Sequence, residues 1–274
     1  MANPASQAAH VAARSRTLEV LARAGLVSWG IVHLTLAWIC VGVAFGEHGG
    51  KADQSGALAT LASNPGGTAL LGVLAIGFLG FAAWQVTEAI RGHRERAAGA
   101  ERILHRVISA GRVLLFGALA AASASFAFGS RGSDSAAEQQ STTSDLLGLP
   151  GGQVLVGAIG LTVVVVGGVL IYRGVARKFW ENLDTATMPR EVEHPTAVLG
   201  ILGYTAKGLV LGVAGALVVS AAVTFDPAKS RGLDAALKTL GEQPYGKVLL
   251  CAAAAGLACF GLYSIVDARY RKIG

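Results

Sequence analysis

Six ionisable residues within long apolar stretches are the positions at which this chain could carry out chemistry. They are Glu88, Arg112, Arg173, Lys207, Asp267 and His33. Charged groups are expensive to place inside a membrane and tend to mark the paths of substrates, ions or protons, so they are the first place to look for function. Together these six residues form a candidate intramembrane polar network.

Two interpretations of the five charged members remain open. In the first, Arg112 and Lys207 pair with Glu88 and Asp267, Arg173 adds another cation, and the group forms a gate or a site for a substrate carboxylate. Such buried pairs are costly unless the charges match. In the second, the long basic side chains lie near the ends of their spans and simply reach the lipid headgroups.

His33 lies about two turns into the first apolar stretch, and Trp29 precedes it by one helical turn. It could ligate haem or a metal ion, or relay protons. A transmembrane haem usually needs a second axial ligand, however, and the other five histidines all lie in connections or tails. Because the internal repeat places Phe116 and Leu211 at the equivalent positions, we expect His33 to pack or to form an interhelical hydrogen bond.

The composition indicates a membrane protein. Hydrophobic residues make up 53% of the 274 residues and charged residues only 15%, whereas a soluble domain has about 25% charged residues. The net charge of +6 comes from basic residues at the ends of apolar blocks, which is typical of membrane topology signals. No basic patch interleaved with aromatic residues is present, so nucleic acid is not an expected partner. The lipid bilayer is, and other membrane-protein subunits are a further expectation.

Six stretches have the length of about 20 residues that a helix needs to cross the hydrocarbon layer. They are Gly25–Phe45, Thr68–Ile90, Val107–Phe128, Gln153–Tyr172, Val198–Val223 and Lys247–Val266. The sequence therefore predicts an all-α integral membrane protein with six transmembrane helices. Residues 1–24 are expected to form a short amphipathic or frayed cytoplasmic segment before the first span.

The connections on one side of the membrane are expected to contain short interfacial helices. The segments 55–65, 144–150 and 231–244 each carry apolar residues and end at a proline that leads into the next span: Pro65, Pro150 and Pro244. Asn64 is expected to cap the second span, with Pro65 in its first turn. The segment 129–144 is polar and rich in small residues, and it is expected to be mobile.

The distribution of basic residues predicts the orientation. Fifteen Lys and Arg residues lie in the two tails and in the connections at 91–106 and 173–190, and six lie in the connections on the other side. Basic residues accumulate on the cytoplasmic side. We therefore expect a multi-pass protein of the cell membrane with both termini in the cytoplasm.

The chain contains an internal repeat. The three prolines at 65, 150 and 244 recur at nearly the same interval as Trp29, Arg112 and Lys207, and the same alignment superimposes Glu88, Arg173 and Asp267. It predicts tandem two-span hairpins at 25–96, 97–180 and 181–274. Each hairpin has an even number of spans, so the repeats are parallel and related by an axis along the membrane normal. A pseudo-threefold ring is the simplest closed arrangement, and a side-by-side row remains open.

The repeat resembles the bacterial Domain of Unknown Function family 1206, whose members are built from tandem copies of such a hairpin. The residues that carry the resemblance are Ala22 to Gly25 with Trp29 and Gly30, and Leu202 to Tyr204 with Lys207 and Gly208. The middle copy departs from the pattern at Ile108 and Val113. Mitochondrial-type carriers also have three two-span repeats, but their signature after the odd spans is missing. The resemblance implies no activity.

No catalytic, cofactor-binding or metal-binding motif is found in the sequence. The three cysteines, Cys40, Cys251 and Cys259, lie in apolar stretches and are expected to pack as small hydrophobic residues. We expect a non-catalytic accessory or scaffold subunit of a bacterial membrane complex. The alternative is a small-solute or ion transporter with a pathway along the pseudo-threefold axis. A third class, a membrane enzyme or haem protein, depends mainly on His33.

Overall fold

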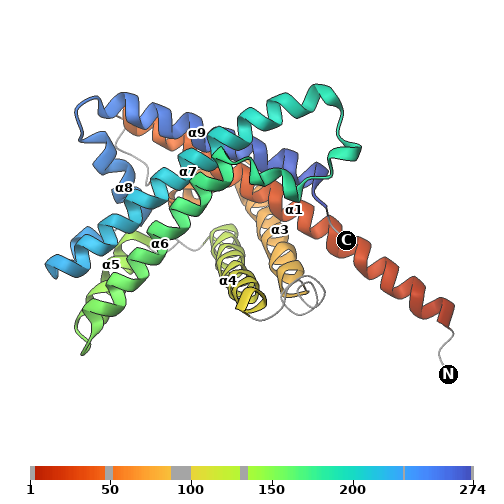
Figure 1. Cartoon of the computed structure of the whole chain (residues 1–274), viewed down its shortest axis with the longest axis horizontal. Helices are drawn as coiled ribbons and strands as arrows, with labels where there is room; N and C mark the ends of the chain where they lie inside the picture. The colour runs from red at the N-terminus through yellow and green to blue at the C-terminus, as the bar shows by residue number, and fades with distance from the viewer. Residues whose placement is uncertain (1–3, 47–51, 88–99, 130–134, 231, 273–274) are drawn as a thin grey trace.

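The computed structural model describes residues 4–46, 52–87, 100–129, 135–230 and 232–272. Its long helices are α1 (Pro4–Ala44), α3 (Gly67–Thr87), α4 (Ala100–Ala127), α6 (Gly152–Val175), α7 (Arg190–Thr224) and α9 (Gly246–Tyr270). Each contains a segment long and apolar enough to cross a bilayer. The predicted all-α architecture with six transmembrane helices is therefore confirmed (Figure 1).

Short helices connect the spans. They are α2 (Gln54–Ala62), α5 (Ser135–Leu147) and α8 (Gly232–Gly241), with the 3-10 helices η2 (Lys178–Asn182), η3 (Thr185–Thr187) and η4 (Pro227–Lys229). Figure 1 shows both termini toward one side of the molecule and α5 and α8 toward the other. Asp234 of α8 accepts a hydrogen bond from the backbone of Ala52, just before α2, at 2.9 Å. This bond joins the outer connections of the first and third repeats.

Two helices begin earlier than the spans and the interfacial segments that the sequence indicates. Helix α1 begins at Pro4 and continues without a break into the first span, and residues 1–3 lie outside the described part. No glycine or proline interrupts 5–24, and Ala, Leu and Arg are strong helix formers. Helix α5 begins at Ser135, within the polar segment 129–144. Residues 130–134 lie outside the described part.

The turn between each short helix and the following span has the same geometry in all three repeats. The residue after the proline adopts a left-handed conformation, with φ of 77° at Gly66, 77° at Gly151 and 66° at Tyr245. The next residue is a glycine, and a Cβ there would lie within 1.8 Å of a backbone carbonyl oxygen of the short helix. The three turns thus share one backbone geometry, although the third repeat has a tyrosine at the position where glycine is favoured.

The predicted capping role of Asn64 is wrong. Its side-chain amide donates to the carbonyl oxygen of Thr60 at 2.7 Å, so it satisfies the last turn of α2 rather than the start of α3. Helix α3 begins only at Gly67. The Pro-Gly-Gly turn separates Asn64 from the free N–H groups of α3, and the orphan carbonyls of α2 are closer.

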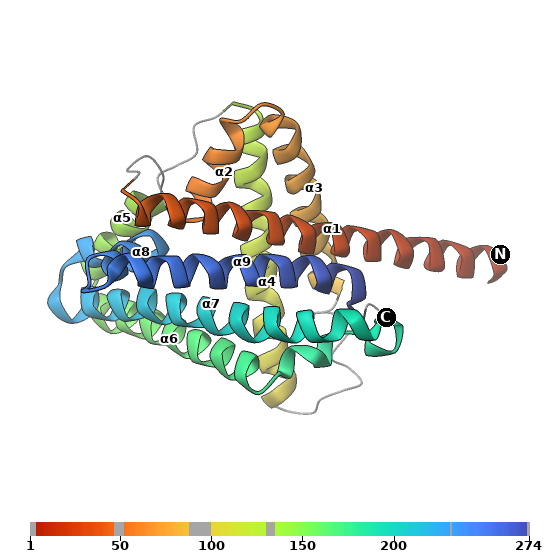
Figure 2. The ribbon, with the colours of Figure 1, turned by 90° about the horizontal axis from the view of Figure 1, so that it is seen from above.

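The six spans form an open row rather than a closed ring. Helix α1 packs on α3 and α9, α7 packs on α9 and α6, and α4 packs on α3. The order of these contacts is therefore α4, α3, α1, α9, α7, α6, and they follow a curved path rather than a straight row, since Arg112 of α4 and Arg173 of α6 interact electrostatically. Within the described residues α4 and α6 share no comparable interface, although both belong to the middle repeat. Figure 2 shows α1, α9, α7 and α6 side by side, with α4 running across their direction.

Glycines allow the closest helix contacts, as small residues do in membrane bundles. A Cβ on Gly167 of α6 would lie 2.7 Å from the carbonyl oxygen of Gly208 on α7, and a Cβ on Gly30 of α1 would lie 2.7 Å from that of Gly261 on α9. Gly208 and Gly212, which are four residues apart on α7, thus both lie beside Gly167 in the α6–α7 interface. The similar spacing Gly42–Gly46 does not serve this purpose, because Gly46 ends the helix with φ of 89° and has open space around it.

Candidate functional site

Lys207 of α7 extends into a cage of aromatic rings inside the bundle. Its ammonium nitrogen lies 4.4 Å from the ring centroid of Trp29 on α1 and 3.9 Å from that of Phe260 on α9. Within the described residues no carboxylate forms a salt bridge with it. The face of an aromatic ring attracts a cation electrostatically, and this replaces part of the lost hydration. Lys207 therefore joins three helices without an ion pair.

His33 completes the cage and is 2% exposed. Its Nδ1 donates to the carbonyl oxygen of Trp29 at 2.8 Å, within the same helix. The imidazole meets the Trp29 ring edge-on at a centroid distance of 4.3 Å and lies 4.8 Å from the Phe260 ring. A ring packed in this way has no neighbouring ligand for a metal, and no group of three His, Cys, Asp or Glu residues suited to a metal ion occurs in the described part of the chain.

Asp267, near the end of α9, is the centre of a second group of charges. Its carboxylate is 4% exposed and lies 3.5 Å from the guanidinium of Arg271, four residues later. Arg112 of α4 and Arg173 of α6 are also close enough to interact electrostatically with it. The Oδ1 atom of Asp267 is buried and has no hydrogen-bond partner among the described residues. We call Arg112, Arg173, Asp267 and Arg271 the charged cluster.

Aromatic side chains form two sets of ring contacts between the helices. Trp29, Phe78, Phe81 and Phe116 form a chain of ring contacts between α1, α3 and α4, with centroid distances from 4.4 to 6.4 Å. Phe179, Tyr204, Phe260 and Tyr263 form a similar set between η2, α7 and α9. Much of the contact between these helices is thus made by packed aromatic rings.

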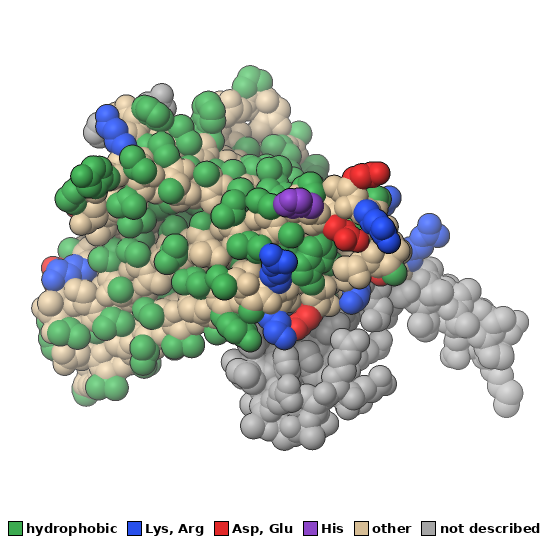
Figure 3. All heavy atoms as spheres, turned by 45° about the horizontal axis from the view of Figure 1, so that its top comes forward, with side chains coloured by type: hydrophobic (Ala, Val, Ile, Leu, Met, Phe, Trp, Pro, Cys, Tyr) green, Lys and Arg blue, Asp and Glu red, His purple; other side chains and the backbone are tan. Residues whose placement is uncertain are grey.

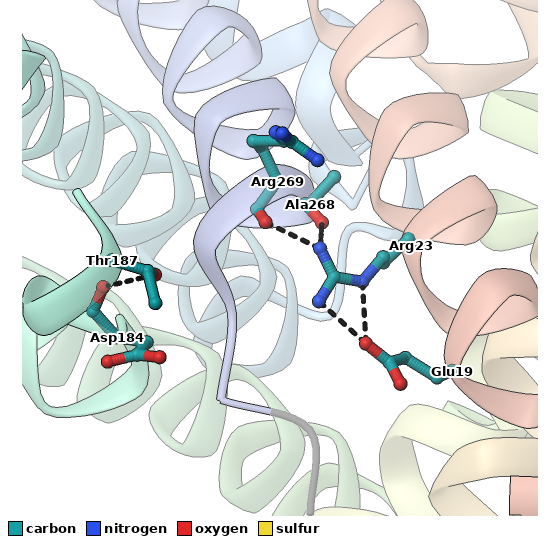
Figure 4. Close-up of polar contacts among 6 residues, drawn as sticks. All are labelled: Glu19, Arg23, Asp184, Thr187, Ala268 and Arg269. Atoms are coloured by element: carbon teal, nitrogen blue, oxygen red, sulfur yellow. Dashed lines mark hydrogen bonds and ion pairs between the residues drawn. The ribbon is translucent and has the colours of Figure 1, made fainter. Parts of the chain in front are cut away.

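Arg23 of α1 holds the end of α9 (Figure 4). Its Nη1 donates to the backbone carbonyls of Ala268 and Arg269, and its Nε and Nη2 donate to the carboxylate of Glu19. The last carbonyls of a helix lack partners within the helix and carry partial negative charge, so a guanidinium is a favourable cap. The contact ties the first span of the chain to the last.

The chain after α9 pairs with the connection between α6 and α7. The backbone of Asp184 donates to Tyr270 at 2.7 Å, and that of Lys272 donates to Asn182 at 3.0 Å. A cavity of about 270 Å³ lies between these segments and α1. Its lining residues are Arg23, Asp184, Thr187, Arg269, Tyr270 and Arg271. Figure 4 shows Asp184 and Thr187 across from the Arg23 contact.

The connection itself carries a separate ion pair outside the spans. Lys178 Nζ donates to Glu181 Oε1 at 2.9 Å. This hydrogen bond raises the pKa of Lys178 and lowers the pKa of Glu181. Both side chains are exposed, so solvent screens the pair and it contributes little to the structure.

The structure divides the six sequence-predicted residues into groups. Arg112, Arg173 and Asp267 come together in the charged cluster, whereas Lys207 and His33 meet in the aromatic cage. Glu88 lies outside the described residues. Sequence reasoning treated Arg271 as part of the basic tail and did not assign Arg23 a role. Asp267 and Arg271 are four residues apart on one helix, and this spacing indicates an ion pair. Nothing in the sequence indicates that Arg23 contacts the end of α9.

Charged and hydrophobic side chains occupy different parts of the surface. On the face shown in Figure 3, Lys, Arg, Asp and Glu gather mainly toward one end, while hydrophobic side chains cover most of the rest. We call the end that holds Arg23, Arg173 and Asp267 the basic end. An exposed apolar surface of this extent requires lipid as its solvent. Six apolar spans with this surface define an integral, multi-pass membrane protein.

The chain belongs to the family described as Domain of Unknown Function (DUF1206), whose model matches three segments, 24–92, 107–177 and 202–271. It is 32% identical over 254 residues to a protein of Bacillus subtilis (strain 168) named "Uncharacterized protein YxxB", and the alignment covers 92% of this chain and 90% of that protein. No solved structure matches the chain. The predicted family and its three repeats are confirmed, and the bacterial relative agrees with a location in a bacterial cell membrane.

Proposed function

We propose that this protein is a non-catalytic accessory or scaffold subunit of a bacterial membrane complex. One observation carries the proposal: every ionisable residue of the spans lies toward the basic end, apart from Lys247 at the outer start of α9. The segments 34–44, 67–86, 113–127, 152–172, 208–224 and 248–266 contain no Asp, Glu, Lys, Arg or His. A path for ions or polar solutes needs polar groups along its length.

The packing of the interior supports the same proposal. The rings of Trp29, Phe78 and Phe116 lie between α1, α3 and α4, and Phe78 is fully buried. A bundle packed in this way, with small connections, is suited to holding other membrane subunits in place.

The proposal includes the orientation of the chain. Both termini are in the cytoplasm, because the basic end contains most of the Lys and Arg residues. Reporter fusions at Ser135 and Ser230 test this, since both positions are expected on the outer side. Activity of a cytoplasmic reporter at either position would contradict the orientation.

A photo-crosslinking experiment tests the scaffold role directly. A photoreactive amino acid is introduced in cells at Val165, which is 57% exposed on α6, and at Val156 of the same helix, which is 2% exposed and serves as the matched control. A partner subunit is expected to give a discrete protein adduct from position 165 only. The same scan on the exposed faces of α3 and α4 extends the search. Adducts with lipid alone at every exposed position, together with a monodisperse single chain in mild detergent, would contradict the proposal.

A transporter is the second candidate, and Lys207 favours it, since its ammonium lies within the bundle without a carboxylate in a salt bridge. Ion and proton flux into vesicles that contain the purified protein distinguishes the two. Flux that is lost in Lys207→Met but kept in Lys247→Met would favour transport. No flux above protein-free vesicles is expected for a scaffold.

A further inference from the structure

In the middle repeat the two spans, α4 and α6, do not pack on each other in the described part of the chain. Within the described residues, much of the surface of both helices therefore has no protein neighbour. Only 22% of the α4 span and 17% of the α6 span are buried, against 39 to 56% for the spans of α1, α3, α7 and α9. In the other two repeats the paired spans pack on each other. Within the described residues, therefore, the two spans of the middle repeat do not share the kind of interface that the paired spans of the other repeats form.

Two arginines belong to the basic ends of these two helices. Arg112 of α4 is exposed, and Arg173 of α6 is half-buried. They are close enough to repel each other electrostatically. Repulsion between like charges is strong where water is scarce, so such a pair is stable only with a counter-charge between or beside the two groups.

The acidic groups in the described residues do not balance this charge. Asp267 contributes one negative charge against Arg112, Arg173 and Arg271 together, and its nearest cation is Arg271. Glu181 also interacts with Arg173, but its hydrogen-bonded partner is Lys178. Counted within the described residues, the charged cluster thus has a net positive charge. The two helices that carry Arg112 and Arg173 also have exposed apolar side chains, which include Leu114, Leu115, Val165, Val166 and Val169.

We propose that an anionic phospholipid occupies the space between α4 and α6, with its phosphate beside Arg112 and Arg173 and its acyl chains on the exposed apolar faces of both helices. Basic pockets between spans at the cytoplasmic side recognise anionic headgroups. Arginine is suited to this because its planar guanidinium binds phosphate oxygens in pairs. The lipid then replaces the missing interface between the two spans of the middle repeat.

Native mass spectrometry of the whole chain tests the proposal. The protein is released from nanodiscs of phosphatidylcholine with or without phosphatidylglycerol or cardiolipin, and the retained lipid is counted. Neutralising an arginine is expected to reduce the retention of anionic lipid by about fivefold, and Arg112→Gln with Arg173→Gln by about 25-fold. The double variant Arg177→Gln with Arg190→Gln is the matched control, since both residues are exposed in the same basic region. Its retention is expected to match that of the wild type.

Two further variants separate lipid binding from a general loss of structure. Arg112→Lys with Arg173→Lys keeps both charges and is expected to retain most of the lipid. Asp267→Asn removes the only carboxylate of the charged cluster and is expected to increase retention, whereas damage to the fold would reduce it. Equal retention in the glutamine double variant and its control would overturn the proposal. Displacement of the lipid by inorganic phosphate, or equal stabilisation by phosphate in pure phosphatidylcholine, would assign the site to a soluble anion instead.

Discussion

The ammonium nitrogen of Lys207 on α7 lies 3.9 Å from the centroid of the Phe260 ring on α9. The internal repeat makes Lys207 the counterpart of Trp29, and in the structure the two equivalent side chains touch, with the nitrogen 4.4 Å from the Trp29 ring. The repeat therefore places matching positions against one another at the α1–α9–α7 junction. One position is aromatic and its equivalent is cationic, which makes the contact attractive.

This contact predicts the effect of removing the charge. Lys207→Met keeps the length and apolar stem of the side chain. A cation–aromatic contact is worth up to about 2 kcal/mol, but an unpaired buried charge costs several kcal/mol in lost hydration. We expect the variant to be more stable than the wild type by about 1 kcal/mol or more, measured by thermal unfolding in detergent. Lys247→Met, at an exposed position, should change little. A less stable Lys207→Met protein would show that the aromatic cage outweighs the desolvation cost.

The contact between Arg23 and the end of α9 predicts a loss of stability. Arg23→Gln leaves the carbonyls of Ala268 and Arg269 without their charged donor. Hydrogen bonds to charged groups are worth about 1.5–3 kcal/mol each, and because Arg23 is partly exposed we expect a loss at the low end of that range. Denaturant unfolding measures it, with Arg190→Gln as the exposed control. Equal midpoints for the two variants would show that water caps α9 as well as Arg23 does.

Neighbouring glycines on α6 provide a matched pair of substitutions. Gly167→Ala places a methyl group 2.7 Å from a backbone oxygen of α7 and must push the helices apart, whereas Gly168→Ala meets open space. We expect the first to destabilise by about 1–3 kcal/mol. The second should be neutral or stabilising by up to about 1 kcal/mol, since alanine favours helix. Thermal unfolding of both proteins checks the prediction, and similar shifts for the two would mean that α6 and α7 do not approach this closely.

The turns before the spans predict a stabilising change at Tyr245. This residue has φ of 66°, where the other repeats have glycine. A side chain in the left-handed region costs about 1–2 kcal/mol, although glycine regains part of this as freedom in the unfolded chain. Tyr245→Gly is therefore expected to raise stability by about 0.5–1 kcal/mol. Gly151→Ala is the reciprocal variant and is expected to lower stability. The two shifts should have opposite signs in the same unfolding assay.

The sequence correctly predicted those features of the fold whose physical cause lies within a single segment of the chain. The length and apolar character of the spans require helices in lipid, because no other open segment satisfies its backbone there. The recurrence of Pro65, Pro150 and Pro244 predicted three copies of one unit, and the copies share their turn geometry. Of the positions that the repeat aligns, Arg173 and Asp267 lie in the charged cluster, whereas Lys207, the equivalent of Arg112, lies in the aromatic cage.

Only the tertiary structure decided how the units fit together. Six spans with similar apolar faces can pack in a ring or in a row, and the difference depends on which glycines meet. Gly167 meets Gly208 and Gly30 meets Gly261, whereas no such approach joins α4 to α6 within the described residues. The cap that Arg23 provides for α9, across the whole length of the chain, has the same origin. Contacts between distant segments depend on shape complementarity, and a periodic pattern of apolar residues does not encode a particular partner.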